Sequence, residues 1–154
     1  MTPNFTVAGD PKLTCSCGCG MLPQQGFMDK MQKLREAFGK PMKVNSAARC
    51  PTYNARVSAT RSLTGPHTTG RAIDFECSHK DADYLMELSY KFSLGITGRG
   101  VNQKGYTRFL HFDDLPDAPG QPRPHLWSYA WIVPLLALVP VQIFDGAAWA
   151  AGYL

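Results

Sequence analysis

The sequence has no run of basic residues, no nucleic-acid-binding motif and comparatively few charges. Charged residues make up 18% of the 154, and the net charge is +4 with a pI of about 8.9. A nucleic-acid-binding domain normally gathers its basic residues on one face or element, so we expect no nucleic acid among the partners. The mild positive balance suits an anionic polymer, and it equally suits a solvated, slightly basic surface.

The sequence also lacks a secretory leader at its start and an even number of cysteines. Residues 1–10 have neither a basic head nor an apolar run, so we expect a protein made in the cytoplasm without a signal peptide. An odd number of cysteines cannot all pair internally, and reduced thiols are therefore expected. The five cysteines are Cys15, Cys17, Cys19, Cys50 and Cys77.

The first three cysteines are separated by one residue each, whereas a zinc knuckle places two residues between ligands. Two interpretations of Cys15–Cys19 stay open. The segment is either part of a second metal site or a tight glycine turn with small buried side chains.

The last stretch of the sequence is almost free of charge. Trp131–Leu154 contains Asp145 as its one charged residue. The length suffices to cross a bilayer, but Pro134 and Pro140 interrupt a helix, and a carboxylate is costly in lipid. We therefore expect a monomer with one domain over residues 1–129 and an apolar tail over 130–154, which contacts a membrane or packs on the domain.

Hydrophobic periodicity predicts an α+β fold, with a small antiparallel sheet flanked by helices. The first predicted helix, Pro23–Gly39, carries an apolar stripe at helical spacing. Further helices are predicted at Pro51–Val57 and from Ser78 or Asp81 to Phe92. The predicted strands are Met42–Asn45, Arg71–Phe75, Gly95–Val101 and Tyr106–Asp113, and a proline-rich loop is expected at Asp114–Pro124.

A histidine and an aspartate lie seven positions apart in the central stretch Gly65–Asp74. Imidazole and carboxylate are both good ligands for a divalent ion such as zinc. A turn at Thr68–Gly70 leads into the strand that contains Asp74. A bend there brings His67 and Asp74 to one ion.

Two further stretches lie in order around this pair: Asn45–Ala55, which contains Arg49-Cys50-Pro51, and Arg108–Asp113, which reads Phe-x-His-x-Asp from Phe109. With Gly65–Asp74 they strongly resemble the zinc D-alanyl-D-alanine peptidase family over roughly residues 4 to 129. Many phage endolysins belong to that family, and it shares its fold with lysostaphin-type enzymes and the hedgehog signalling domain.

The resemblance implies a zinc ion (Zn²⁺) held by His67, Asp74 and His111. It also implies that Arg49 stabilises the oxyanion formed during hydrolysis and binds substrate together with Ser46. The implied substrate is the stem peptide of bacterial peptidoglycan. The protein would then act on the cell wall, with membrane association through its tail left open.

The general base is where the sequence departs from the family. Relatives place an acidic residue three positions before the last histidine ligand or a histidine two before it, and Arg108 and Phe109 stand there instead. Asp113 is our choice, because residues two apart on a strand share a face and it follows His111. An orienting carboxylate is the alternative role for Asp113. Glu76 and His125 are the other candidates for the base.

Three functions stay open from the sequence. The first is a zinc peptidase that cuts bonds at D-amino acids in peptidoglycan, as a phage lysin or a wall-processing enzyme. The second is a zinc-bound but inactive wall-binding module, because the usual base is missing. The third is a structural phage component anchored by its apolar tail.

Overall fold

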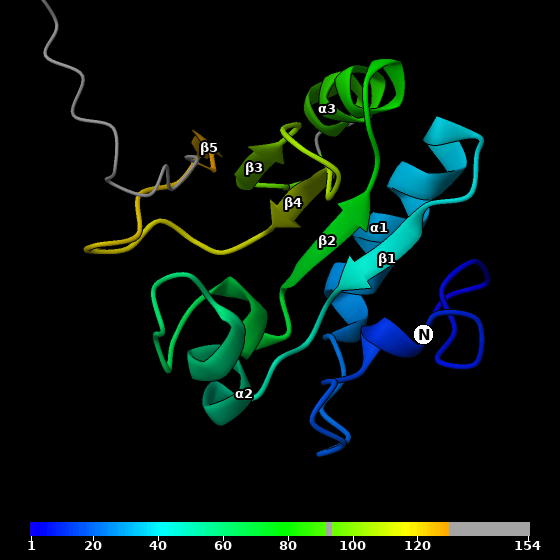
Figure 1. Ribbon diagram of the computed structural model, residues 1–154. Helices are drawn as coiled ribbons and strands as arrows, with labels where there is room; N and C mark the ends of the chain where they lie inside the picture. The colour runs from blue at the N-terminus through cyan, green and yellow to red at the C-terminus, as the bar shows by residue number, and fades with distance from the viewer. Residues whose placement is uncertain (92–93, 130–154) are drawn as a thin grey trace, which may run out of the picture.

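The computed structural model describes residues 1–91 and 94–129, which form a five-stranded sheet with helices packed against it (Figure 1). The strand order is β1-β2-β4-β3-β5. The strands are β1 (Lys43–Ser46), β2 (Ala72–Glu76), β3 (Gly98–Asn102), β4 (Phe109–Asp113) and β5 (His125–Ser128). The helices are α1 (Gln25–Phe38), α2 (Pro51–Val57) and α3 (Lys80–Lys91), with 3₁₀ turns η1 (Pro11–Leu13) and η2 (Pro66–Thr69).

The hydrophobic core lies between one face of the sheet and the two longer helices. In Figure 1, α1 lies behind the sheet, and it contacts α3. The stripe of α1 is buried, as the helical spacing predicts. It packs with the inward residues of β2 and β4 in a single cluster that includes Phe27, Met31, Leu34, Ile73, Phe75, Leu110 and Phe112. The predicted α+β class is confirmed.

Strand alternation assigns the other face of the sheet to polar residues. Asp74 lies between Ile73 and Phe75 and therefore points away from the core. The antiparallel register of β2 and β4 pairs Asp74 with His111. Residues opposite each other across a strand pair share a face, so the fold itself brings these two side chains together.

The sheet differs from the prediction at one edge, because β5 pairs with β3 in parallel. The predicted antiparallel pairing is found between β1, β2, β4 and β3, and the parallel pair with β5 makes the sheet mixed. Strand β5 returns to the sheet through the long loop after β4, so no hairpin signal marks it. Its residues also show no burial alternation typical of a strand on a core.

Two glycines of β3 leave the space that their neighbours fill. A Cβ at Gly98 would lie 2.1 Å from Asp113 Oδ2, and one at Gly100 would lie 2.7 Å from the Trp127 ring. Glycine inside a strand commonly marks such a close approach. The glycines of β3 thus admit Asp113 and Trp127 to the polar face of the sheet.

Replacing Gly98 with alanine should lower the free energy of unfolding by about 1–3 kcal/mol, because the added methyl group displaces the buried Asp113 carboxylate. The control is Gly26→Ala in α1, where a Cβ meets nothing within 4 Å. That change should leave stability unchanged or raise it by up to about 1 kcal/mol. Urea unfolding measures both, and an equal effect of the two substitutions would contradict the packing described for β3.

The apolar tail predicted over 130–154 lies outside the described residues. Within residues 1–91 and 94–129, no helix has both the length and the apolar character needed to cross a membrane.

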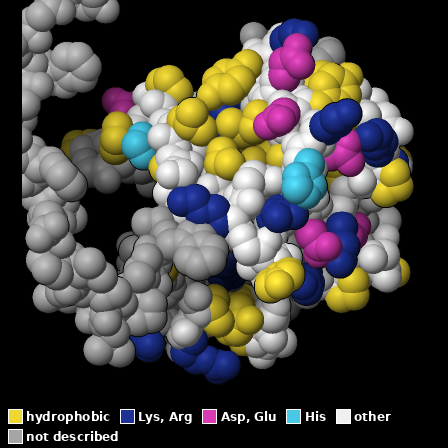
Figure 2. Space-filling view, turned by 45° about the horizontal axis from the view of Figure 1, so that its top comes forward, with side chains coloured by type: hydrophobic (Ala, Val, Ile, Leu, Met, Phe, Trp, Pro, Cys, Tyr) yellow, Lys and Arg dark blue, Asp and Glu magenta, His cyan; other side chains and the backbone are white. Residues whose placement is uncertain are grey.

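The face that carries α3 shows acidic and basic side chains interleaved (Figure 2), and two of its ion pairs are Lys40–Asp81 and Lys91–Glu87.

Candidate metal site and active-site cleft

Three predicted ligands meet on the polar face of the sheet. Asp74 comes from β2, His111 from β4, and His67 from the turn η2 that precedes β2. All three are buried, and the facing donor atoms lie within 4.8 Å of one another. His111 Nδ1 is 2.8 Å from Asp74 Oδ1, and His67 Nε2 is 3.3 Å from Asp74 Oδ2. The structure therefore brings His67, Asp74 and His111 together as one candidate site.

The outer nitrogen of each imidazole is held by an acceptor. His67 Nδ1 is 2.6 Å from the Ala47 carbonyl oxygen, and His111 Nε2 is 3.2 Å from Asp113 Oδ2. Where such an oxygen accepts a hydrogen bond from the ring N–H, the other nitrogen of the neutral imidazole carries the lone pair and faces Asp74. In each contact, a proton or a metal cation between the ring nitrogen and the carboxylate makes the interaction favourable. This donor arrangement fits zinc, whose histidine ligands give their second N–H to such acceptors.

The charge states of His67 and Asp74 fit a metal, whereas for His111 burial alone would lower the pKa but hydrogen bonds to Asp113 and Asp74 raise it. Burial lowers the pKa of His67, which keeps this imidazole in the neutral form that binds metals. Burial by itself would raise the pKa of the Asp74 carboxyl, but His67 and His111 hold that pKa well below its usual range. The site therefore presents an anionic carboxylate beside imidazole nitrogens.

Arg49 lies beside these candidate ligands, and Ser46 holds it in place. Arg49 Nη2 donates to Asp74 Oδ2 over 2.9 Å, and its Nε donates to Ser46 Oγ over 2.8 Å. A bulge between Val44 and Ser46 places Ser46 opposite Asp74. The guanidinium is thus fixed by two side chains and lies directly beside the candidate ligands.

A family model described as Peptidase M15 matches residues 4–113. The chain belongs to the peptidase M15 family. Peptidases of this family are zinc-dependent, and the His-Asp-His cluster is a candidate zinc site in this M15 chain. No curated protein and no solved structure matches the chain.

Asp113, the predicted general base of this M15 peptidase, lies on the far side of His111 from Asp74. It is fully buried and faces His111 Nε2. Arg123 donates to both of its oxygens, over 3.0 and 2.9 Å, and the Leu115 N–H donates over 3.2 Å. These donors occupy both oxygens of Asp113, and the imidazole ring separates it from Asp74. Asp113 is therefore placed to orient His111. The geometry thus favours the orienting role over the base.

The two other base candidates of this M15 chain lie in different surroundings. Glu76, at the far end of β2, is exposed and forms an ion pair of 2.7 Å with Lys43. His125 is exposed on β5 and stacks on Trp127 at a ring distance of 5.5 Å. The Trp127 ring in turn lies 5.1 Å from that of His111. Of the two, His125 is nearer to the ligands, but Trp127 lies between it and His111.

A cleft of about 320 Å³ opens over the ligands. Arg49, His67, Asp74 and His111 share its lining with Trp127 and Tyr129, and small residues of the segment after α2 form its other wall. Burial, followed by the charge of Asp74, raises the pKa of Tyr129 to about 12, so the phenol keeps its proton at neutral pH. Among the described residues that line the cleft, Asp74 is the one carboxylate.

Arg123 and Tyr129 were not predicted as parts of the site, whereas the sequence left Trp127 open as a cleft or a core residue. All three lie beyond the matched residues 4–113. Arg123 stands in a proline-rich loop, where nothing in the sequence connects it to Asp113. The alternation of Gly98 and Gly100 within a strand was the available signal that large side chains approach the sheet here.

Replacing Asp113 with asparagine should weaken zinc binding by roughly tenfold to a hundredfold, the usual cost of losing a residue that orients a ligand. Asparagine keeps the shape but loses the charge that Arg123 and His111 share. Competition with a chromogenic chelator measures the affinity, and Asp81→Asn, an exposed carboxylate of α3, is the control. Unchanged zinc affinity in Asp113→Asn would contradict the orienting role.

Proposed function

We propose that this M15 chain is a zinc peptidase that hydrolyses bonds at D-amino acids in peptidoglycan stem peptides, as an endolysin or a wall-processing enzyme. The observation that carries the proposal is the convergence of His67, Asp74 and His111 with Arg49 in one cleft. A catalytic zinc takes three protein ligands and keeps one position open, and the described residues supply three.

The substrate class rests on the resemblance to D-alanyl-D-alanine peptidases and on the character of the cleft. The wall of the cleft that follows α2 contains the small residues Ala59, Thr64 and Gly65. We infer that this wall accommodates a peptide with small side chains such as that of alanine. Arg49 supplies a positive group for a peptide carbonyl or carboxylate, and the net charge of +4 suits an anionic wall polymer. Peptidoglycan stem peptides are small, alanine-rich and acidic.

Different groups of the cleft supply different parts of the proposed hydrolysis. When bound, zinc supplies a water of lowered pKa and polarises the scissile carbonyl. Arg49 donates hydrogen bonds to the oxygen that gains negative charge. The protonated Tyr129 is a second donor in the same cleft. We assign proton transfer to His125, which stacks on Trp127 and lines the hollow beside this cleft.

Zinc-loaded protein should cleave a stem pentapeptide that ends in D-Ala–D-Ala, or purified peptidoglycan, and should leave the all-L peptide intact. Chelator should stop cleavage and added zinc should restore it, because the ligands hold the ion on which hydrolysis depends. Mass spectrometry of the products identifies the bond.

His67→Ala should be inactive, whereas the control His79→Asn, at an exposed position with a φ of 55° that asparagine tolerates, should match the parent. Equal cleavage of the D- and L-peptides would contradict the proposed substrate class.

Replacing Arg49 with lysine should reduce turnover by roughly a hundredfold to a thousandfold, the usual cost of removing one oxyanion donor. Lysine carries the charge but cannot contact both Ser46 and Asp74 through a planar fork. Steady-state kinetics on the pentapeptide measure the loss, with Arg56→Lys in α2 as the control. Turnover within about threefold of the parent would show that Arg49 stabilises no oxyanion.

A second candidate function is a zinc-bound binding module without catalysis. The observation in its favour is that the described cleft residues include no carboxylate apart from Asp74, which faces both histidines. A zinc-loaded protein that sediments with peptidoglycan yet cleaves neither substrate would establish this alternative.

A further inference from the structure

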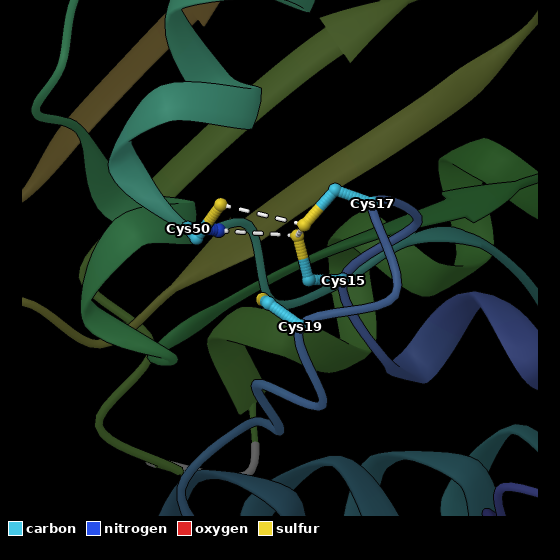
Figure 3. A group of neighbouring side chains, drawn as sticks. All are labelled: Cys15, Cys17, Cys19 and Cys50. Carbon is cyan, nitrogen blue, oxygen red and sulfur yellow. Dashed lines mark hydrogen bonds between the residues drawn. The ribbon is translucent and has the colours of Figure 1, made fainter.

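Four of the five cysteines form a second cluster away from the cleft. Cys15, Cys17, Cys19 and Cys50 place their sulfur atoms within 4.8 Å of one another. Figure 3 shows the side chains extending toward a common centre from two separate segments. The fifth cysteine, Cys77, follows β2 and lies outside the cluster.

The loop between η1 and α1 is folded to present its three cysteines. The Cys15 N–H donates to the Met21 carbonyl over 3.0 Å, which closes the loop at its base. Gly18 and Gly20 have φ angles of 83° and 77°, in the left-handed region that glycine favours. These turns direct the sulfur atoms of Cys17 and Cys19 back toward that of Cys15.

The fourth cysteine reaches the cluster from the start of α2. The Cys50 N–H donates to Cys15 Sγ over 3.2 Å, and the Tyr53 N–H donates to Cys50 Sγ over 3.4 Å. Backbone N–H groups directed at sulfur stabilise the thiolate form, which is the form that binds metals. Two of the four sulfurs, those of Cys15 and Cys50, therefore have N–H partners for the negative charge of a thiolate.

We propose that Cys15, Cys17, Cys19 and Cys50 bind one zinc ion as a structural four-thiolate site. Four cysteines close the coordination shell of zinc and leave no position for water or substrate, which is typical of structural sites. Thiolates select soft metals, and a tetrahedral set of four sulfurs indicates zinc or iron. Sulfurs within 4.8 Å of one another fit a single ion.

A disulfide explains the arrangement less well. Cys17 Sγ lies 3.3 Å from Cys15 Sγ and 3.5 Å from Cys50 Sγ, so it has two partners at nearly equal distance. Bonded sulfurs lie at about 2.0 Å. Any one disulfide would leave two thiols of the cluster unused, whereas one metal ion uses all four.

The position of the cluster gives the zinc a structural task. Cys50 directly follows Arg49 in the sequence. The two residues before Arg49 are hydrogen-bonded to η1: the Ala47 N–H donates to the Lys12 carbonyl, and the Ala48 N–H donates to the Leu13 carbonyl. The Ala47 carbonyl in turn holds His67. A metal that joins Cys50 to the loop after η1 would therefore fix the segment that positions both Arg49 and His67.

Metal analysis by mass spectrometry on purified protein tests the proposal without any measurement of activity. The parent should contain about two zinc ions per chain, and Cys17→Ser and His67→Ala about one each. The double variant should contain about none. Cys77→Ser, the matched control, should keep the parent content. If Cys17→Ser keeps the zinc content of the parent, the proposal is overturned, whatever the result for His67→Ala.

Two measurements on the parent chain avoid any dependence on how variants fold. Cobalt in place of zinc should give intense sulfur-to-metal charge-transfer absorption, which the His-Asp-His ligands cannot produce. Alkylation followed by peptide mapping should spare the four cluster cysteines until zinc is removed, after which they should react. Immediate alkylation of all four, an intramolecular disulfide, or iron in place of zinc would overturn the four-thiolate zinc site.

Discussion

The site depends on the contacts that surround the buried carboxylate of Asp74. A charge in such surroundings is tolerated when it is paired on all sides, and Asp74 contacts His67, His111 and Arg49. Each contact comes from a different part of the fold. The register of β2 with β4 supplies His111, η2 supplies His67, and the segment between β1 and α2 supplies Arg49. The sheet of this M15 chain thus brings the three partners of the Asp74 carboxylate together.

A second chain of contacts extends from Asp74 toward the edge of the sheet. His111 links Asp74 to Asp113, and Asp113 is held by Arg123 from the loop before β5. The glycines of β3 leave room for this carboxylate and for Trp127. The loop and β5 follow the matched residues 4–113, and they support the orientation of a candidate metal ligand through Arg123 and Asp113.

Sequence patterns predicted the elements whose signals are local. The stripe of α1 and the bounds of α2 follow from spacing and from Pro51 at the first helical position, and the three motifs indicated the ligands. Strand β5 and Arg123 escaped prediction because both depend on a long return of the chain. The role of Asp113 was open because shared strand faces cannot show which side of an imidazole a neighbour takes. The cysteine cluster was undecided because Cys50 is distant in sequence from the other three cysteines and joins them only in the fold.

We propose that His67, Asp74 and His111 hold zinc, with His111 turned so that Nδ1 faces the metal. Diffraction at the zinc absorption edge from crystals of the metal-loaded protein tests it most directly. We expect an anomalous peak about 2.0–2.2 Å from His67 Nε2, an Asp74 oxygen and His111 Nδ1, with Asp113 still at His111 Nε2. A peak bound to His111 Nε2, or no peak among these three residues in crystals that contain zinc, would contradict it.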